Sequence, residues 1–563
     1  MKKQIIECVP NISEGRDPVI IDTIAAQAET VEGVKLLDVD PGKATNRTVI
    51  TFVGEPEAVV EAAFRLIKKA AELIDMSKHK GEHPRFGATD VCPLVPVANI
   101  TMEEVVAYAH KLGHRVGEEL GIPGYFYENA ATREERRNLA NCRAGEYEGL
   151  AKKLVDPHWQ PDFGPAAFDK AITTGATAIS ARDFLVAYNI NLNTTSTRRA
   201  NAIAFDIRER GRVKREGNPL TGKIVKDDQG NPVNIPGSLK AVKGIGWYIE
   251  EYGIAQLSLN LTNISITPVH LAFDEACRKA EARGVRVTGS ELVGLVPLQA
   301  MLDAGKYFLR KQQRSTGVSE AELIKIAVKS LGLDELKPFN PKEKIIEYML
   351  AEDNAQPLIA MNLAGFADET ASESPAPGGG SIAAYVGALG VSLGTMVANL
   401  SAHKRGWDDR WEEFSDWAEK GMAYQQTLLA LVDEDTAAFN KIMDAFGLPK
   451  GNDAEKAARQ QAIQEATKYA TEVPFNVLAT AYKSMEVMQA MADIGNPNSV
   501  TDAGVGALCA RTAVRGALLN VKINAAGLTD KAFAKDIVAR GEAIAEKAKD
   551  LEDAILARVE GKL

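Results

Sequence analysis

The stretch RTVITFVGEPEAVVEAAFRLIKKAAELIDM, residues 47–76, indicates the fold of the first part of the chain. Residues 47–54 are rich in β-branched side chains, which is typical of a strand. From residue 55 the apolar side chains recur three and four positions apart, which predicts an amphipathic helix. A strand followed directly by a helix is the repeating unit of proteins that pack helices on a sheet.

The same alternation extends in both directions from this stretch. Strands are predicted at 4–12, 34–40, 89–97 and 124–130, and a helix at 101–121. After DPHWQPDFGP the pattern restarts, with a strand region at 176–192, a helix at 197–212, a strand at 255–267, a helix at 268–284 and a strand at 285–297. The polar segment 215–237 is rich in Gly, Pro, Asn and Asp, which predicts a loop or hairpin insertion. We therefore expect two α/β subdomains that divide near residue 184.

The last third of the chain has a different character. A capping-box pattern, Ser319 to Glu322, predicts a helix start, and a further helix is expected at Asn340-Pro341. From residue 358 nearly every segment has helical periodicity. The expected domains are therefore 1–184 and 185–350, both α/β and sandwich-like, a linker at 351–357, and an all-α helical bundle at 358–563.

The segment 374–402 contains no charged residue and is long enough to span a bilayer. It is dominated by Gly, Ala and Ser, however, and it lacks the aromatic side chains that flank membrane spans. Small residues allow helices to approach closely, which favours a central helix buried on all sides in a bundle. We expect no membrane span.

The composition of the chain argues against several classes of protein. The 563 residues carry a net charge of −10, which argues against a general nucleic-acid binder. The five cysteines form no CxxC pair, which argues against a disulfide scaffold and against thiolate zinc sites. The N-terminus has no continuous apolar run of the kind that signal peptides need. We expect a reduced, cytoplasmic protein.

The stretch DMSKHKGEHPRFGATDVCPLVPV, residues 75–97, places two histidines on a loop that enters a strand. His83 titrates near neutral pH and is a candidate to take and return a proton. His79 and His83 as metal ligands are less favoured, because basic residues crowd the loop and no third ligand is evident. A solvated loop histidine is the alternative. Asp40 lies at the end of a predicted strand, and Arg47 lies at the start of the next one. Two interpretations are open: the side chains line the rim of a binding site, or they only form turns.

A series of motifs runs along the chain: ECVPNISEGRD, LLDVDPGKATNRTV, GEHPR, NCRAGEYEGL, WQPDFGP and GSELVGLVPL, followed by APGGGS and LVDEDTAAF. Together these motifs resemble the formimidoyltransferase-cyclodeaminase family over essentially the whole chain. The resemblance implies a bifunctional folate enzyme of histidine degradation. It would move the formimino group of N-formimino-L-glutamate to tetrahydrofolate, then close the product to 5,10-methenyltetrahydrofolate and release ammonia. Tetrahydrofolate, polyglutamylated, would be the co-substrate, with no metal.

The resemblance also implies roles for residues of the transferase part. The histidine of GEHPR, His83, would be catalytic. From its position at a strand end, Asp40 is a candidate to orient this imidazole. Arg47 and Arg85 are candidates to hold substrate carboxylates, because a guanidinium group binds a carboxylate through two hydrogen bonds. Folate contacts would fall on the segment 164–175, which includes Gly164, Pro165 and Gly175, and on Gly237.

In the helical part the family's proton acceptor matches Asp435, whereas Asp433 should point to another side of its helix. The glycines of APGGGS (Gly378, Gly379 and Gly380) would approach the ligand at a helix N-terminus. Basic residues were considered for a polyglutamate tail, namely His403, Lys404, Arg405, Arg511, Arg515 and Lys522. The small-residue core predicts a homo-oligomer. Alternatives are a helical domain that is a methenyltetrahydrofolate cyclohydrolase or inactive, and a non-catalytic folate-binding scaffold.

Overall fold

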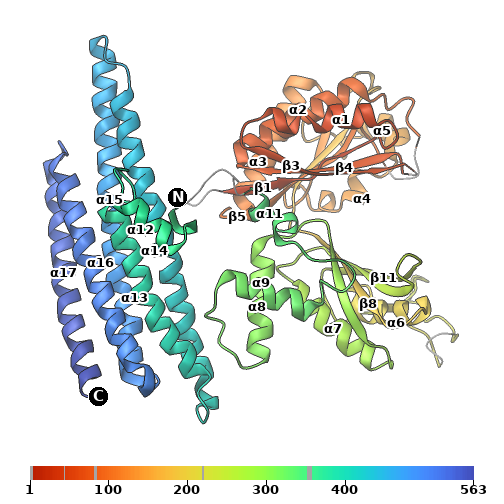
Figure 1. Ribbon diagram of the computed structural model, residues 1–563. Coiled ribbons are helices and arrows are strands. Elements are labelled where there is room, and N and C mark those ends of the chain that lie inside the picture. Colours follow the sequence, from red (N-terminus) through yellow and green to blue (C-terminus); the bar gives the residue numbers. More distant parts are fainter. Residues whose placement is uncertain (1–3, 44, 81–84, 218–220, 351–357) are drawn as a thin grey trace. The chain divides into compact units, whose positions relative to one another are not determined.

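The computed structural model of the protein describes residues 4–43, 45–80, 85–217, 221–350 and 358–563 (Figure 1). Contacts between residues divide the chain into two compact units. The first contains residues 1–300 and 331–351, and the second contains residues 301–330 and 352–563. The prediction of two α/β subdomains followed by an all-helical region is confirmed.

The first subdomain is built on a mixed sheet with strand order β1-β4-β2-β5-β7-β6, in which β3 pairs with β4. Its strands are β1 (Ile5–Cys8), β2 (Asn11–Ile12), β3 (Val34–Gly42), β4 (Arg47–Gly54), β5 (Thr89–Ala98), β6 (Gly124–Glu128) and β7 (Thr177–Ala181). Strand β7 runs parallel to β5 and β6, and the other pairs are antiparallel. Its helices are α1 (Pro18–Ala25), α2 (Pro56–Leu73), α3 (Met102–Leu120), α4 (Leu139–Cys142) and α5 (Glu146–Val155).

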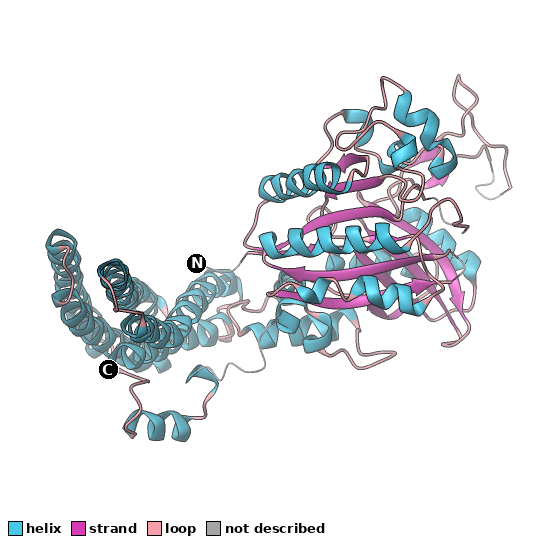
Figure 2. Ribbon diagram, turned by 90° about the horizontal axis from the view of Figure 1, so that it is seen from above, coloured by secondary structure: helices cyan, strands magenta, loops and turns pink. Residues whose placement is uncertain are grey.

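Both faces of this sheet are covered, because successive side chains of a strand point to opposite faces. On β6, Phe126 joins a core with residues of α2 and α3, whereas Tyr125 and Tyr127 join a second core with residues of α4 and α5. Figure 2, with strands in magenta and helices in cyan, shows helices lying over the strands. The loop 74–88 connects α2 to β5 and carries the histidines discussed above.

The second subdomain has an antiparallel sheet with strand order β11-β12-β8-β13. Its strands are β8 (Val186–Leu192), β11 (Val242–Ile249), β12 (Ile254–Leu261) and β13 (Val287–Val293). Helices α6 (Thr197–Ile207) and α7 (Val269–Glu281) pack on it, and two short helices follow, α10 (Pro341–Lys344) and α11 (Ile346–Leu350). Strand β9 (Arg212–Val213) lies just before the predicted insertion and pairs with β10 (Asn234–Ile235) near its end.

The second unit consists of helices: α8 (Leu298–Lys311), α9 (Glu320–Leu331), α12 (Leu363–Ala371), α13 (Gly379–Ala402), α14 (Trp411–Gly447), α15 (Asp453–Ile494), α16 (Val500–Ala526) and α17 (Lys531–Glu560). Helix α13 is apolar enough to span a membrane, with a mean hydropathy of 1.6, but it packs against α14, α15 and α16 (Figure 1). A side chain on Gly390 would come within 2.7 Å of the Gly506 carbonyl oxygen, so glycine is needed where α13 crosses α16.

The expectation that α13 is buried on all sides is wrong in one respect. Leu389, Met396 and Leu400 form an exposed strip along the helix. Periodicity could not reveal this strip, because the apolar character of α13 is nearly uniform around its circumference.

The loop between α8 and α9 and the side chains of α8 make polar contacts with α13 and α14. The backbone N–H of Thr316 donates to Ser415 Oγ at 3.0 Å, and Asn399 Nδ2 donates to the Gly317 carbonyl at 2.8 Å. Lys306 and Arg310 both form ion pairs with Glu419. These contacts group residues 301–330 with the helical unit.

We expect Gly317→Ala to lower the free energy of unfolding by about 1–3 kcal/mol, because its Cβ would lie 2.3 Å from that of Ala418. Gly447→Ala is the control, since an added Cβ there meets nothing within 4 Å. Urea unfolding followed by circular dichroism measures both. Equal midpoints for the two variants would contradict the packing of this segment.

Candidate active sites

A cavity in the helical unit opens at the first turn of α13. Its lining comes from the loop before α13 and from α13, α14, α15 and α16: Pro375, Ala376, Gly378, Gly379, Gly380, Asp435, Thr436, Phe439, Ile442, Ala470, Asn520 and Asn524. The structure thus brings the predicted glycines and the predicted proton acceptor Asp435 into one site, although they lie more than 50 residues apart in the sequence.

Asp435 is held against the first turn of α13 by Ser381. The backbone N–H of Ser381 donates to Asp435 Oδ2 at 2.9 Å, and the Ser381 hydroxyl lies 3.1 Å from the same oxygen. A side chain on Gly380 would lie 2.1 Å from Asp435 Oδ1, so only glycine lets the carboxylate approach. Burial raises the pKa of Asp435, while the hydrogen bonds from Ser381 oppose that rise.

Asp433 points away from this cavity, in agreement with the helical spacing. Its Oδ1 accepts a hydrogen bond of 2.6 Å from the backbone N–H of Leu358, at the start of the 3₁₀ turn Leu358–Ala360. The two aspartates of LVDEDTAAF therefore have different surroundings, and only Asp435 faces a cavity.

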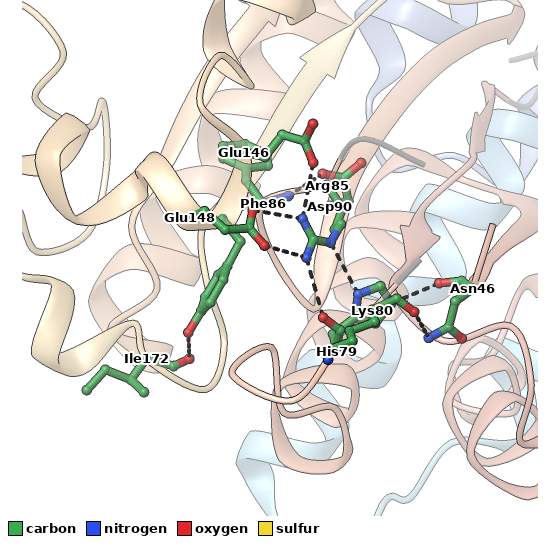
Figure 3. Close-up of polar contacts among 10 residues, drawn as sticks. Asn46, His79, Lys80, Arg85, Phe86, Asp90, Glu146, Glu148 and Ile172 are labelled. Carbon is green, nitrogen blue, oxygen red and sulfur yellow. Dashed lines mark hydrogen bonds and ion pairs between the residues drawn. The ribbon is translucent and has the colours of Figure 1, made fainter. Parts of the chain in front are cut away.

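In the first unit the loop between α2 and β5 is closed at its base by a hydrogen-bonded cluster (Figure 3). Arg85 Nε donates to His79 Nδ1 at 3.3 Å, and Arg85 Nη2 lies 3.4 Å from the His79 carbonyl oxygen. His79 Nε2 lies 3.0 Å from the Asn46 carbonyl oxygen, and Asn46 Nδ2 donates to the Lys80 carbonyl at 3.1 Å. We call His79, Arg85 and Asn46 the loop clamp. His83 lies outside the described residues.

Arg85 is already engaged by two carboxylates. Its guanidinium pairs with both oxygens of Glu148, at 2.8 and 3.0 Å, and with Glu146 at 3.1 Å. The hydrogen bonds that Arg85 donates to Glu148 raise the pKa of Arg85. Figure 3 shows both glutamates on the side of Arg85 opposite His79. The expected contact of Arg85 with a substrate carboxylate stays a prediction, since it requires exchange of these partners.

Arg47 lies at the edge of a buried charge cluster. Its guanidinium donates to Asn11 Oδ1, and burial lowers its pKa. Nearby Asp90 is fully buried and pairs with Arg143 at 2.8 Å. Burial raises the pKa of Asp90, against the opposing effect of Arg143. Burying a charged group costs free energy unless the group is paired with an opposite charge. The pairing in this cluster therefore fixes the arrangement of the side chains at this end of the sheet.

The structure places the remaining predicted site residues of the first unit in different surroundings. Asp40 is exposed on β3, and the imidazole that it was expected to orient belongs to the undescribed His83. Pro165 is half-buried. The three predicted folate-binding glycines each lack room for a side chain, because a Cβ would lie 2.0–2.2 Å from a carbonyl oxygen: that of Ile122 for Gly164, Phe86 for Gly175 and Arg208 for Gly237. Backbone packing alone thus accounts for these glycines.

Two of the basic residues considered for a polyglutamate tail have acidic partners. Arg511 pairs with Glu552 at 3.5 Å, and Lys522 pairs with Glu542 at 2.6 Å. Within the described ranges, His, Cys, Asp and Glu side chains form no group of three that could hold a metal.

Several site residues were missed by the sequence interpretation. The sequence interpretation assigns no role to Ser381, Asn520 or Asn524, and it considers His79 only as a disfavoured metal ligand. Ser381 adjoins the glycine motif and could have been noticed there. Asn520 and Asn524 had no local signal, because an asparagine inside a predicted helix is uninformative until tertiary contacts are known.

We expect the loop clamp to weaken in acid. Burial lowers the pKa of His79, so its stabilising contribution is complete above its ordinary value of about 6.5 and is lost as the pH falls through the lowered value. A proton on Nδ1 would abolish the bond from Arg85 and add a cation beside Arg85 and Arg16, with Glu14 as the nearby anion. Amide hydrogen exchange of residues 75–80, measured between pH 5 and 8, tests this.

At pH 8 the segment should exchange faster in His79→Gln than in the unmodified protein, and the difference should vanish towards pH 5. Parallel pH profiles of the two proteins would contradict the assignment of a neutral, hydrogen-bonded His79.

Matches to known proteins extend over nearly the whole chain. The N-terminal subdomain of the formiminotransferase domain matches residues 5–182, the formiminotransferase domain matches 187–351, and formiminotransferase-cyclodeaminase matches 362–543. A formimidoyltransferase-cyclodeaminase of Gallus gallus is 44% identical over 558 residues, 99% of each chain.

Two shorter relatives match separate parts. A glutamate formimidoyltransferase of Streptococcus pyogenes is 41% identical over 309 residues, covering 54% of this chain and 94% of its own length. A methenyltetrahydrofolate cyclohydrolase of Methylorubrum extorquens is 39% identical over 198 residues, covering 35% of this chain and 95% of its own. The full-length similarity and the three successive matches show that the chain belongs to the formimidoyltransferase-cyclodeaminase family.

Proposed function

We propose that this chain transfers the formimino group of N-formimino-L-glutamate to tetrahydrofolate, then cyclises 5-formiminotetrahydrofolate to 5,10-methenyltetrahydrofolate with release of ammonia, in histidine degradation. The observation that carries the proposal is the Asp435 carboxylate in its glycine-walled cavity, in a chain similar to bifunctional relatives over its full length.

The transfer step is assigned to the first unit. N5 of tetrahydrofolate attacks the formimino carbon, and the bond from that carbon to the glutamate nitrogen breaks. His83 takes the proton from N5 and returns one to the glutamate nitrogen, so that it ends in its starting state. Asp40 orients the imidazole, and Arg47 and Arg85 bind carboxylates of the substrates. Gly164, Pro165, Gly175 and Gly237 contact the folate.

The closure step is assigned to Asp435. N10 attacks the carbon of the protonated formimino group, whose terminal nitrogen already carries two hydrogens. Asp435 accepts the N10 proton, and the bond from the carbon to the terminal nitrogen breaks. That nitrogen leaves as ammonia with the proton that Asp435 returns to it. Burial makes the carboxylate a stronger base, because it raises the pKa of Asp435, and Ser381 fixes its position. Gly378, Gly379 and Gly380 allow the folate to approach the first turn of α13.

The alternatives are less well supported. A helical domain that acts only as a cyclohydrolase is not favoured, because the full-length relative carries the name of a cyclodeaminase. A non-catalytic scaffold would not require a carboxylate with a raised pKa at a cavity.

Asp435→Asn should abolish ammonia release from supplied 5-formiminotetrahydrofolate and spare transfer, while His83→Ala should do the reverse. A loss of about 10²-fold or more in the affected step is expected for removal of a proton-transfer group. Asp433→Asn is the matched control on the same helix. Ammonia, and methenyltetrahydrofolate by its ultraviolet absorbance, are followed in parallel. A folded variant that lost both activities would contradict this division.

We further propose a homo-oligomer formed through the helical unit and a cytoplasmic location. Exposed apolar residues continue from α13 onto the adjoining helix α16, where Val505, Leu508, Leu519 and Ile523 are 44–71% exposed. Such a patch favours a second copy as its cover. All five cysteines are free, and Cys8 and Cys92 remain thiols at an Sγ–Sγ distance of 3.5 Å, which supports a reducing compartment.

Replacing Leu519 and Ile523 together by Glu should reduce the molar mass measured by light scattering, because charges would be buried without partners. Val155→Glu, a 69% exposed residue of the first unit, is the control. An unchanged mass for the double variant would contradict the assignment of this interface.

A further inference from the structure

Two asparagines of α16 form the wall of the cavity at Asp435. Asn520 and Asn524 are one helical turn apart, so their side chains share a face of α16. Both are partly buried, and Asn520 lies beside Gly379, where an added Cβ would be 3.4 Å from its Nδ2 and 3.7 Å from its Oδ1. The site already described uses neither residue.

The orientation of both amides is determined by carbonyl partners. Asn524 Nδ2 donates to the Ala470 carbonyl of α15 at 2.6 Å, and Asn520 Nδ2 donates to the Gly516 carbonyl at 3.0 Å. A carbonyl oxygen only accepts hydrogen bonds, so each NH₂ group must face its carbonyl. Over the described residues, the two Oδ1 atoms have no hydrogen-bond donor from the protein. The wall therefore offers the cavity two acceptor oxygens.

Asp435 supplies further acceptor capacity to the same cavity. Both hydrogen bonds from Ser381 go to Oδ2, whereas Oδ1 lies at the side-chain-free surface of Gly380. The hydroxyl of Thr436 also lines the cavity and can donate or accept. A ligand group that satisfies these oxygens must carry N–H or O–H donors, and a positive charge would suit the carboxylate.

We propose that Asn520 and Asn524 bind the terminal nitrogen of a formimino group and so select a substrate that can release ammonia. This rests on the proposed function. Bound to N5, the formimino group is an amidine. When protonated it is a planar cation with N–H bonds on its terminal nitrogen. The methenyl bridge, the substrate of a cyclohydrolase, is also cationic but has no N–H bond.

The same contacts serve the closure step. After N10 attacks, the terminal nitrogen accepts the proton returned by Asp435 and becomes positively charged before its bond to carbon breaks. The amide oxygens of Asn520 and Asn524 accept hydrogen bonds from this departing group as its charge develops. Their contribution is therefore larger in the transition state than for a bound product that lacks N–H bonds.

The test uses the full chain with Asn520→Leu, Asn524→Leu and the double variant, because leucine retains the volume and removes the acceptor. Thr512→Ala, an exposed position of the same helix outside the cavity lining, is the control. Ammonia release from supplied 5-formiminotetrahydrofolate and binding of 5,10-methenyltetrahydrofolate are both measured. The expected result is a fall of about tenfold or more in kcat/KM for ammonia release, with the methenyl Kd changed by less than about twofold.

A second measurement needs no variant. Acetamidinium, which has N–H donors, should inhibit ammonia release by the unmodified chain in competition with the folate substrate. Tetramethylammonium has the same charge and no N–H bond, and it should not inhibit. Equal inhibition by both cations, or equal losses of methenyl binding and ammonia release in the variants, would overturn the assignment. If the unmodified chain released no ammonia, the proposed function itself would fall.

Discussion

The helical unit depends on the close contact between the first turn of α13 and the carboxylate of Asp435. Two conditions allow it: position 380 has no side chain, and the backbone N–H of Ser381 is free to donate because the first turn of a helix leaves its N–H groups without intrahelical partners. The partial positive charge at a helix N-terminus also favours an anion there. One contact thus joins α13 to α14 and fixes the position of the Asp435 carboxylate.

The two sites differ in how they use charge. Around the loop clamp, the cation of Arg85 is compensated by Glu146 and Glu148 before any substrate arrives. The cavity at Asp435 contains one carboxylate and neutral amides, so its charge remains available to a cationic ligand. The first arrangement fixes the Arg85 side chain, whereas the second favours discrimination between cations. This difference suits a transfer between two anionic substrates followed by a reaction of an amidine.

Periodicity in the sequence predicted the strands and helices well, because burial on one face leaves a regular apolar pattern. It could not predict that β7 lies between β5 and β6 with parallel pairing, since strand order depends on contacts distant in sequence. It also could not predict that the loop between α8 and α9 contacts α13 and α14, because an amphipathic helix reveals its apolar face but not the partners of the loops beside it. For the sites, Asp435 and its glycines followed from the family resemblance, whereas the pairing of Asp90 with Arg143 spans 53 residues and had no sequence signal.

The grouping of residues 301–330 with the helical unit has a consequence for how such a chain can be divided. The polypeptide contributes to the first unit, then to the second, then to the first again, and finally to the second. A single break in the 351–357 segment would therefore leave Thr316 and Gly317 on the wrong fragment and uncover Ser415 and Glu419 on the other. If the gene were split at that point, each product would expose residues that are covered in the full chain, and those surfaces would have to change. The order of segments along the chain thus means that no single cut separates the two units.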